Sequence, residues 1–139
     1  MQLAPDEARR RFADAAVARL ATVRADGAPH LVPVVFAADG DRIVMAVDPK
    51  PKRSRDLRRL RNIASNPAVS LLVDHYEADW RALWWVRADG LARIVESGRE
   101  RDEVIDRLIE KYPQYVELPG DFGDAVIVTV TAWSSWSAT

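Results

Sequence analysis

Hydrophobic and polar residues alternate along much of this chain with the period of two that is typical of half-buried β-strands. Three runs of this kind, over residues 18–24, 29–37 and 42–47, are separated by Asp26-Gly27 and by Asp39-Gly40-Asp41. Asp-Gly between apolar runs is a strong hairpin signal. We therefore expect three antiparallel strands in the first half of the chain.

The helical period appears in three other segments. A first helix is expected over residues 6–20, a short one over 55–64 with Ser54 as its N-cap, and a third over 96–111. Each has apolar residues three or four positions apart, so each predicts one face packed on a core.

The remaining apolar runs predict strands over residues 68–76, 84–95 and 125–138, with a loop over 112–124. Asp89-Gly90 inside the second of these runs predicts a kink or a hairpin. Strand-helix-strand alternations are too few for a parallel sheet. We expect a single domain over residues 1–139, mostly β, in which a small antiparallel barrel carries helices on its outside.

Composition removes several classes of function. The chain has no cysteine, which excludes disulfides, thiolate catalysis and cysteine-based metal sites. No apolar run approaches the length of a membrane span, and the first residues lack the apolar core of a signal peptide. We expect a cytoplasmic protein with no membrane partner.

A local basic stretch stands out against a net charge of -1. Seven Lys or Arg residues lie between Lys50 and Arg61, opposed only by Asp56. Charge runs are usually solvated helix faces, but this one begins before the predicted helix and continues into its N-terminus, where backbone N–H groups favour anions. The stretch contains no aromatic residue for stacking on bases, so a compact phosphate site is favoured over nucleic acid.

Aromatic residues suggest a second feature. Trp80, Trp84 and Trp85 lie close together, and neighbours on a strand point to opposite faces. They either pack in a core or dimer interface or form a wall for a flat ring. A ring wall and a phosphate clamp together indicate a phosphorylated, planar redox cofactor.

Other chemistry has little support in the sequence. His30 and His75 are the only histidines, so we expect no metal site. The sequence has no glycine-rich phosphate loop and no serine with an evident paired base. Hydrolytic catalysis is therefore not indicated.

Two longer stretches resemble a known family. LATVRADGAPHLVPVVFAADGDRIVMAVD resembles the opening strands of the pyridoxamine-5′-phosphate-oxidase-like split β-barrel proteins. The next stretch, from KPKR through LRRLRNIASNPAVSLLVDHY to DWRALWWVRADG, is similar to the subgroup that uses the deazaflavin coenzyme F420. Trp84-Trp85 stands where the pyridoxamine phosphate oxidases have an Arg-Gln pair, which argues against that substrate and favours a more apolar pocket.

The resemblance implies a six-stranded antiparallel split barrel that forms a homodimer, with the cofactor in a cleft between the protomers. It also implies which residues bind F420. The anionic tail would contact the basic segment and the start of the short helix, at Lys50, Lys52, Arg53, Arg58, Arg59 and Asn62. The ring would lie against the second and third strands, near Val32, Pro33, Val34 and Val35, with Trp80 and Trp85 bounding the ring or its substrate.

The implied activity is hydride transfer between F420 and a small, hydrophobic organic substrate, with Tyr76 or His75 as proton donor. Three alternatives stay open. The first is an FMN-dependent oxidase or reductase of the same fold. The second is a protein that binds F420 or haem without turnover, and the third is a nucleic-acid binder. Haem would need His30 or His75 as an axial ligand.

Overall fold

The computed structural model describes residues 1–49 and 57–139. Their helices are α1 (Pro5–Asp14), α2 (Arg58–Ser65) and α3 (Arg99–Lys111), with short 3₁₀ turns η1 (Trp80–Ala82) and η2 (Pro113–Glu117). The strands are β1 (Ala18–Val23), β2 (Pro29–Val34), β3 (Ala37–Asp39), β4 (Arg42–Ala46), β5 (Ala68–His75), β6 (Trp84–Val95) and β7 (Ala125–Ser137).

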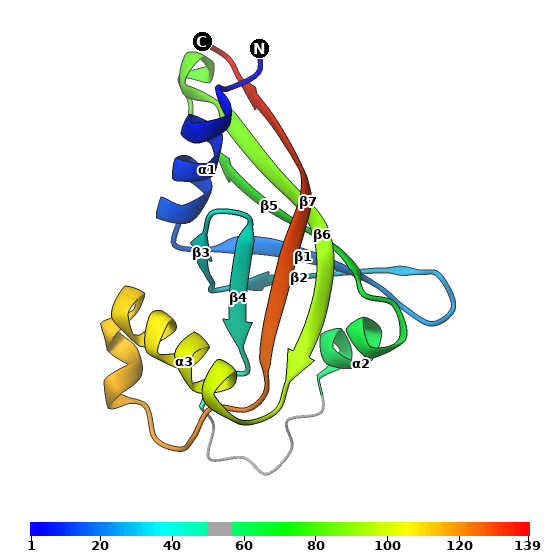
Figure 1. Cartoon of the computed structure of the whole chain (residues 1–139). Coiled ribbons are helices and arrows are strands. Elements are labelled where there is room, and N and C mark those ends of the chain that lie inside the picture. Colours follow the sequence, from blue (N-terminus) through cyan, green and yellow to red (C-terminus); the bar gives the residue numbers. More distant parts are fainter. Residues whose placement is uncertain (50–56) are drawn as a thin grey trace.

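All seven strands belong to one sheet with the order β2-β1-β5-β6-β7-β4-β3, and every pairing is antiparallel. The helices lie around it (Figure 1). The mostly-β fold with peripheral helices is thus confirmed. The predicted six-stranded barrel is corrected to seven strands in an open sheet, because within the described residues no ladder joins the end strands β2 and β3.

The seventh strand arises from a break in the predicted run 29–37. The backbone of Phe36 bonds to side chains at the end of α3. Its carbonyl accepts from the ammonium of Lys111, the last residue of α3 (2.9 Å), and its N–H donates to the hydroxyl of Tyr112, the next residue (3.2 Å). Pro33 has no N–H to extend the ladder. The chain therefore turns at Val35-Phe36, and Ala37–Asp39 pairs with β4 instead.

The first helix is shorter than expected for a related reason. It ends at Asp14, and Ala15 is already extended with ψ 144°. The carbonyls of Ala13 and Ala15 accept from the Lys111 ammonium at 3.1 and 2.8 Å, so a side chain from α3 satisfies the free end of the helix. Tertiary contacts that are distant in sequence set this boundary.

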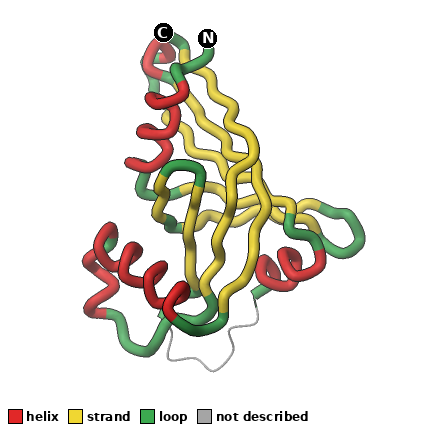
Figure 2. Tube along the Cα trace, viewed as in Figure 1, coloured by secondary structure: helices red, strands yellow, loops and turns green. Residues whose placement is uncertain are grey.

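The sheet bends around its main core. Leu20 of β1 and Ile43 of β4 belong to one buried cluster, although three strands separate β1 from β4 in the sheet order. Phe12 anchors α1 to this cluster, with its ring centroid 5.0 Å from Phe36 and 5.3 Å from Trp133. A second cluster lies where α3 covers the other face of β4 and β7 (Figure 2).

The kink that Asp89-Gly90 predicts is a β-bulge. Asp89 pairs with Ala132 and Gly90 with Val130, so Thr131 is an extra residue on β7. A Cβ added to Gly90 would lie 2.4 Å from the Thr129 carbonyl oxygen, which explains why glycine occupies this position.

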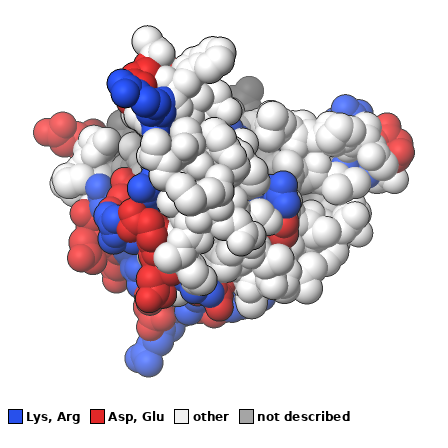
Figure 3. All heavy atoms as spheres, turned by 90° about the horizontal axis from the view of Figure 1, so that it is seen from above, with Lys and Arg blue, Asp and Glu red and all other residues white. Residues whose placement is uncertain are grey.

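In the described parts of the chain, no helix is long and apolar enough to cross a membrane. Charged side chains of both signs gather together on one side of the face seen in Figure 3, while much of that face is uncharged.

Candidate functional site: a cavity at the open side of the sheet

A cavity of about 270 Å³ lies between the first strands, the end of β4 and the helix α2. Most of its wall is aliphatic, with two charged side chains. The lining residues are Val17, Leu20, Pro33, Val34, Val35, Met45, Ala46, Val47, Asp48, Leu57, Arg59, Leu60 and Val126. The cavity lies where β2 ends at Val34 and the sheet stays open, and Arg59 and Leu60 of α2 form part of its wall.

The charged wall of the cavity is formed by Arg59 and Asp48. Burial lowers the pKa of the Arg59 guanidinium, and the nearby Asp48 carboxylate acts in the opposite direction. Within the described residues no carboxylate lies within 4 Å of this guanidinium. A half-buried cation beside an apolar cavity is suited to an anionic or strongly polar group on a flat ligand.

Tyr115 fixes the position of Asp48. Its hydroxyl donates to Asp48 Oδ1 at 2.7 Å. Burial and the neighbouring carboxylate raise the pKa of the Tyr115 hydroxyl, so it stays a donor across the physiological range. Sequence reasoning missed this pair, since nothing in the local pattern links two residues that are 67 positions apart.

The predicted ring-binding segment enters this cavity for the most part. Pro33, Val34 and Val35 line it. Val32 is not among the lining residues and packs against the main core. Pro33 and Val34 are the last two residues of β2, and Val35 follows it. Side chains alternate between faces only within a strand, so consecutive residues can line one cavity at the place where the strand ends.

The predicted tail-binding residues are divided. Lys50, Lys52 and Arg53 lie outside the described residues, as does the predicted N-cap Ser54. Arg59 lines the cavity, whereas Arg58 is exposed and does not. Asn62 is 3% exposed, and its Nδ2 donates to Thr22 Oγ1 at 2.9 Å, so its side chain joins α2 to β1.

The tryptophans lie away from this cavity. Trp80 is 75% exposed in η1. Trp84 faces the core and Trp85 the opposite surface of the sheet, as the alternation predicts. Trp85 shares a broad hollow of about 500 Å³ with Leu31, Leu72 and Tyr76. We name this surface the outer sheet face.

The predicted proton donors also lie outside the cavity of their own chain. Tyr76 is 65% exposed on the outer sheet face. His75 lies at the end of β5, where its Nε2 contacts the Glu77 carboxylate. His30 lies on β2 with a buried Nδ1 that has no hydrogen-bond partner among the described residues. In the same part of the chain, no group of three acidic or histidine residues could hold a metal ion.

Fold and cavity together define a small antiparallel-sheet protein with a mainly aliphatic cavity at the open side of its sheet. The chain belongs to the pyridoxamine 5′-phosphate oxidase family, whose model matches residues 4–136. A 5a,11a-dehydrotetracycline/5a,11a-dehydrooxytetracycline reductase of Streptomyces rimosus is 33% identical over an alignment of 112 residues, and the match covers 76% of this chain and 75% of that protein.

Solved structures share the fold. A conserved hypothetical protein of Mycobacterium tuberculosis has a TM-score of 0.79 at 21% identity, covering 98% of this chain and 86% of that one. A FAD-binding protein of Mesorhizobium loti has a TM-score of 0.74 at 20% identity, covering 97% and 95%.

Proposed function

We propose that this protein is an F420-dependent reductase of the pyridoxamine 5′-phosphate oxidase family. One structural observation carries the proposal: Pro33–Val35 and Arg59, which were assigned to cofactor binding from the sequence, line one cavity. The family match and the reductase relative support an oxidoreductase role. The choice of F420 rests on the sequence resemblance of the segment from Lys50 onwards.

The residues of the cavity fit a planar, anionic cofactor. Aliphatic side chains such as Leu60 and Met45 offer a dry surface to a ring, and Arg59 offers a cation to its polar edge or tail. In this proposal Lys50, Lys52, Arg53 and Arg58 bind the rest of the tail. Bound, reduced F420 supplies a hydride to an electron-poor double bond of the substrate. The protein contributes position and the exclusion of water.

A homodimer is part of the proposal. An isologous interface pairs the same patch of two copies, so it needs a surface that is complementary to itself. The outer sheet face carries Arg19 and Arg87 together with Asp74, around the exposed apolar side chains of Leu31 and Tyr76. Two copies packed on this face would cover that apolar surface, and Tyr76 or His75 stays the proton donor of the proposal.

A flavin is the second candidate for the cofactor. A structural neighbour is a FAD-binding protein, and the cavity chemistry described above also suits an isoalloxazine ring. F420 and flavins differ in the length and charge of the tail, so their relative affinity separates the two proposals.

The test is a pair of titrations of the purified protein, with F420 and with FMN, followed by intrinsic fluorescence of its five tryptophans. We expect saturable quenching by F420 at micromolar concentrations or below, and weaker binding of FMN. Tighter FMN binding would transfer the protein to the flavin-dependent branch. The absence of saturation with either compound would contradict the cofactor proposal as a whole.

A further inference from the structure

A second concave surface lies beside the cavity, between α1 and the ends of β5 and β6. Its volume is about 460 Å³, and its polar and aromatic lining includes two carboxylates beside the cations: Arg10, Arg11, Arg19, His75, Trp84, Asp14 and Asp74. We name it the α1 groove. Val17 lines both the groove and the cavity, so the two hollows share part of a wall.

Flat side chains form one part of this groove. The rings of His75 and Trp84 are nearly parallel, with 20° between their planes and 6.3 Å between their centroids. The Arg11 guanidinium lies 5.2 Å from the centre of the Trp84 ring. Planar groups in this arrangement favour a planar ligand, because stacking on an indole or guanidinium is strongest for flat π-systems.

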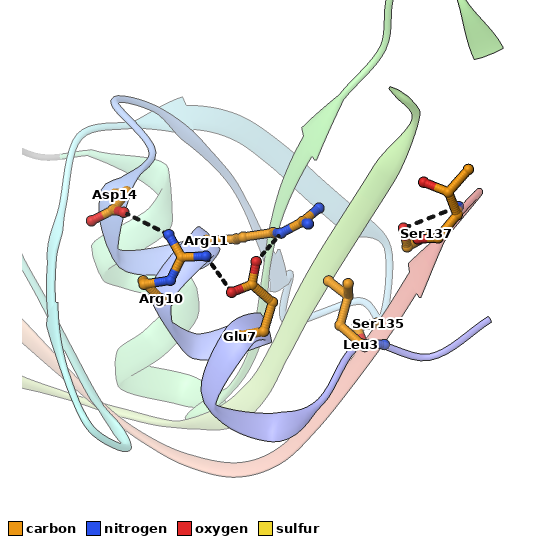
Figure 4. A network of polar contacts seen from close by, with 8 residues as sticks. Leu3, Glu7, Arg10, Arg11, Asp14, Ser135 and Ser137 are labelled. Atoms are coloured by element: carbon orange, nitrogen blue, oxygen red, sulfur yellow. Dashed lines mark hydrogen bonds and ion pairs between the residues drawn. The ribbon is translucent and has the colours of Figure 1, made fainter. Parts of the chain in front are cut away.

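The groove is held in place before any ligand arrives. Glu7 accepts from Arg11 Nε at 2.9 Å and also contacts Arg10, which in turn lies 3.8 Å from Asp14 (Figure 4). Both arginines lower the pKa of the Glu7 carboxyl, Arg11 most, so Glu7 stays ionised. At the base of the groove, the Ala15 carbonyl is fixed by the Lys111 ammonium.

Arg19 differs from the other two arginines of the groove. Arg10 and Arg11 are neutralised by Glu7 and Asp14, whereas no carboxylate of the described chain lies within 4 Å of the Arg19 guanidinium. Arg19 is exposed at the edge where the groove meets the outer sheet face. It is therefore the cation with capacity for an anionic ligand group, and a guanidinium binds a carboxylate or enolate through two donors.

We propose that the α1 groove is the substrate site of the proposed reductase and binds a flat, fused-ring molecule that carries an acidic enol, phenol or carboxylate. This inference rests on the proposed function, since the cofactor would lie in the adjoining cavity. The rings stack against Trp84 and His75, and the acidic group pairs with Arg19. The tetracycline-class substrate named for the Streptomyces relative has this chemistry.

The test uses tetracycline, a stable fused-ring acid, as the probe, with EDTA present so that bound metal plays no part. Binding to the full chain is measured by the change in tetracycline fluorescence for the wild type, Arg19→Gln and Trp84→Leu. Arg24→Gln, on an exposed arginine that directly follows the same strand, is the matched control. We expect Arg19→Gln to weaken binding about ten-fold or more, because a charged hydrogen-bond pair is lost, and Arg24→Gln to bind like the wild type.

The cofactor titration, repeated on each variant, separates the two proposals. Unchanged F420 or FMN affinity in Arg19→Gln, together with weaker tetracycline binding, supports the groove. Size-exclusion chromatography shows whether Arg19→Gln has the same oligomeric state as the wild type. If it does not, the tetracycline affinity of Trp84→Leu is the test of the groove. Two results would overturn the groove as the substrate site and leave the cofactor proposal standing. In the first, the wild type binds the cofactor but shows no saturable tetracycline binding. In the second, all variants bind tetracycline with equal affinity.

Discussion

Arg59 and Asn62 lie three residues apart on α2, and only one of them reaches the cavity. The family resemblance assigns both to the anionic tail of the cofactor. The structure turns Asn62 towards Thr22, a partner forty positions away, and leaves Arg59 at the cavity wall. Asn62 as a cofactor ligand stays a prediction. The sequence pattern of a short amphipathic helix predicts which residues belong to it. It does not predict which polar side chains face a cavity, because that depends on hydrogen-bond partners in other elements.

Gly90 shows the opposite case, in which a single residue is predictable from the sequence. Asp89-Gly90 inside the predicted strand indicates a kink or a hairpin, and the structure has the kink, as a β-bulge with a register shift between β6 and β7. What the sequence does not reveal is the reason: a Cβ at this position would meet the backbone of Thr129 at 2.4 Å and the Val128 side chain at 3.0 Å.

Gly90→Ala is therefore expected to lower the free energy of unfolding by about 2–3 kcal/mol, because backbone atoms have to move apart in a packed sheet. Urea unfolding followed by fluorescence measures this. Gly27→Ala is the control, since Gly27 has φ +88° but no neighbouring atom within 4 Å, and its backbone strain should cost only about 1 kcal/mol. Equal losses in the two variants would contradict a steric role for Gly90.

At the scale of elements, α3 does more than cover one side of the sheet. Its last residue, Lys111, and the following Tyr112 hold the end of α1 and the break between β2 and β3. The Tyr112 hydroxyl also donates to the Ala16 carbonyl at 2.9 Å. Val17 and Val35, which line the cavity, are neighbours of these fixed positions.

This arrangement explains which element boundaries the sequence predicts and which it does not. Strand limits that depend on local turns agree closely: predicted 68–76 and 84–95 are observed as Ala68–His75 and Trp84–Val95. The predicted helix 6–20 continues too far, because its true end depends on Lys111, almost a hundred residues later. Helix α3 itself starts at Arg99 rather than at residue 96. The periodicity of apolar residues identifies the helices and strands. Where some of them end depends on contacts with side chains that are distant in the sequence.

Lys111 gives a test of this clamp through pH. Burial lowers the pKa of its ammonium to about 8, against roughly 10.4 in an unfolded chain. Between these values the unfolded state binds more protons, so the free energy of unfolding should rise with pH from about 8 to 10. Lys111→Met should abolish this rise and, by leaving the Ala13 and Ala15 carbonyls without their donor, lower stability at pH 7 by about 1–3 kcal/mol.

The measurement is urea unfolding of both proteins at several pH values between 7 and 10. The window stops at pH 10 because burial raises the pKa of Tyr112 and Tyr115, and raised tyrosine pKa values lower stability above that pH. Identical pH dependence in the wild type and Lys111→Met would show that the ammonium does not titrate in the folded state as this structure requires.

At the scale of the whole molecule, the sequence predicts a mostly-β protein with outer helices but not the openness of its sheet. Closure would need the end strands β2 and β3 to pair, and the turn at Val35-Phe36 leads Ala37–Asp39 to pair with β4 instead. The same opening produces the cavity. The feature that the sequence pattern predicts least well is thus the one on which the proposed site depends.

The outer sheet face leads to a prediction about assembly. If two copies pack on this face, Leu31→Glu should convert the dimer to a monomer, because a charge would be buried in an apolar interface. Val116→Glu is the matched control, since Val116 is an equally exposed apolar residue on η2. Size-exclusion chromatography with light scattering gives the mass of each. A dimeric Leu31→Glu protein, or a monomeric wild type, would contradict dimerisation through this face.

The measurement that most directly tests the central claim is the F420 affinity of Arg59→Gln, by tryptophan fluorescence, beside the wild type and Arg107→Gln. Arg107 pairs with Asp39 at 3.3 Å and does not line the cavity, so its substitution controls for loss of one positive charge. The account predicts that Arg59→Gln binds F420 about ten-fold or more weakly and that Arg107→Gln binds it like the wild type. Equal affinity in all three proteins would contradict the assignment of the cavity as the cofactor site.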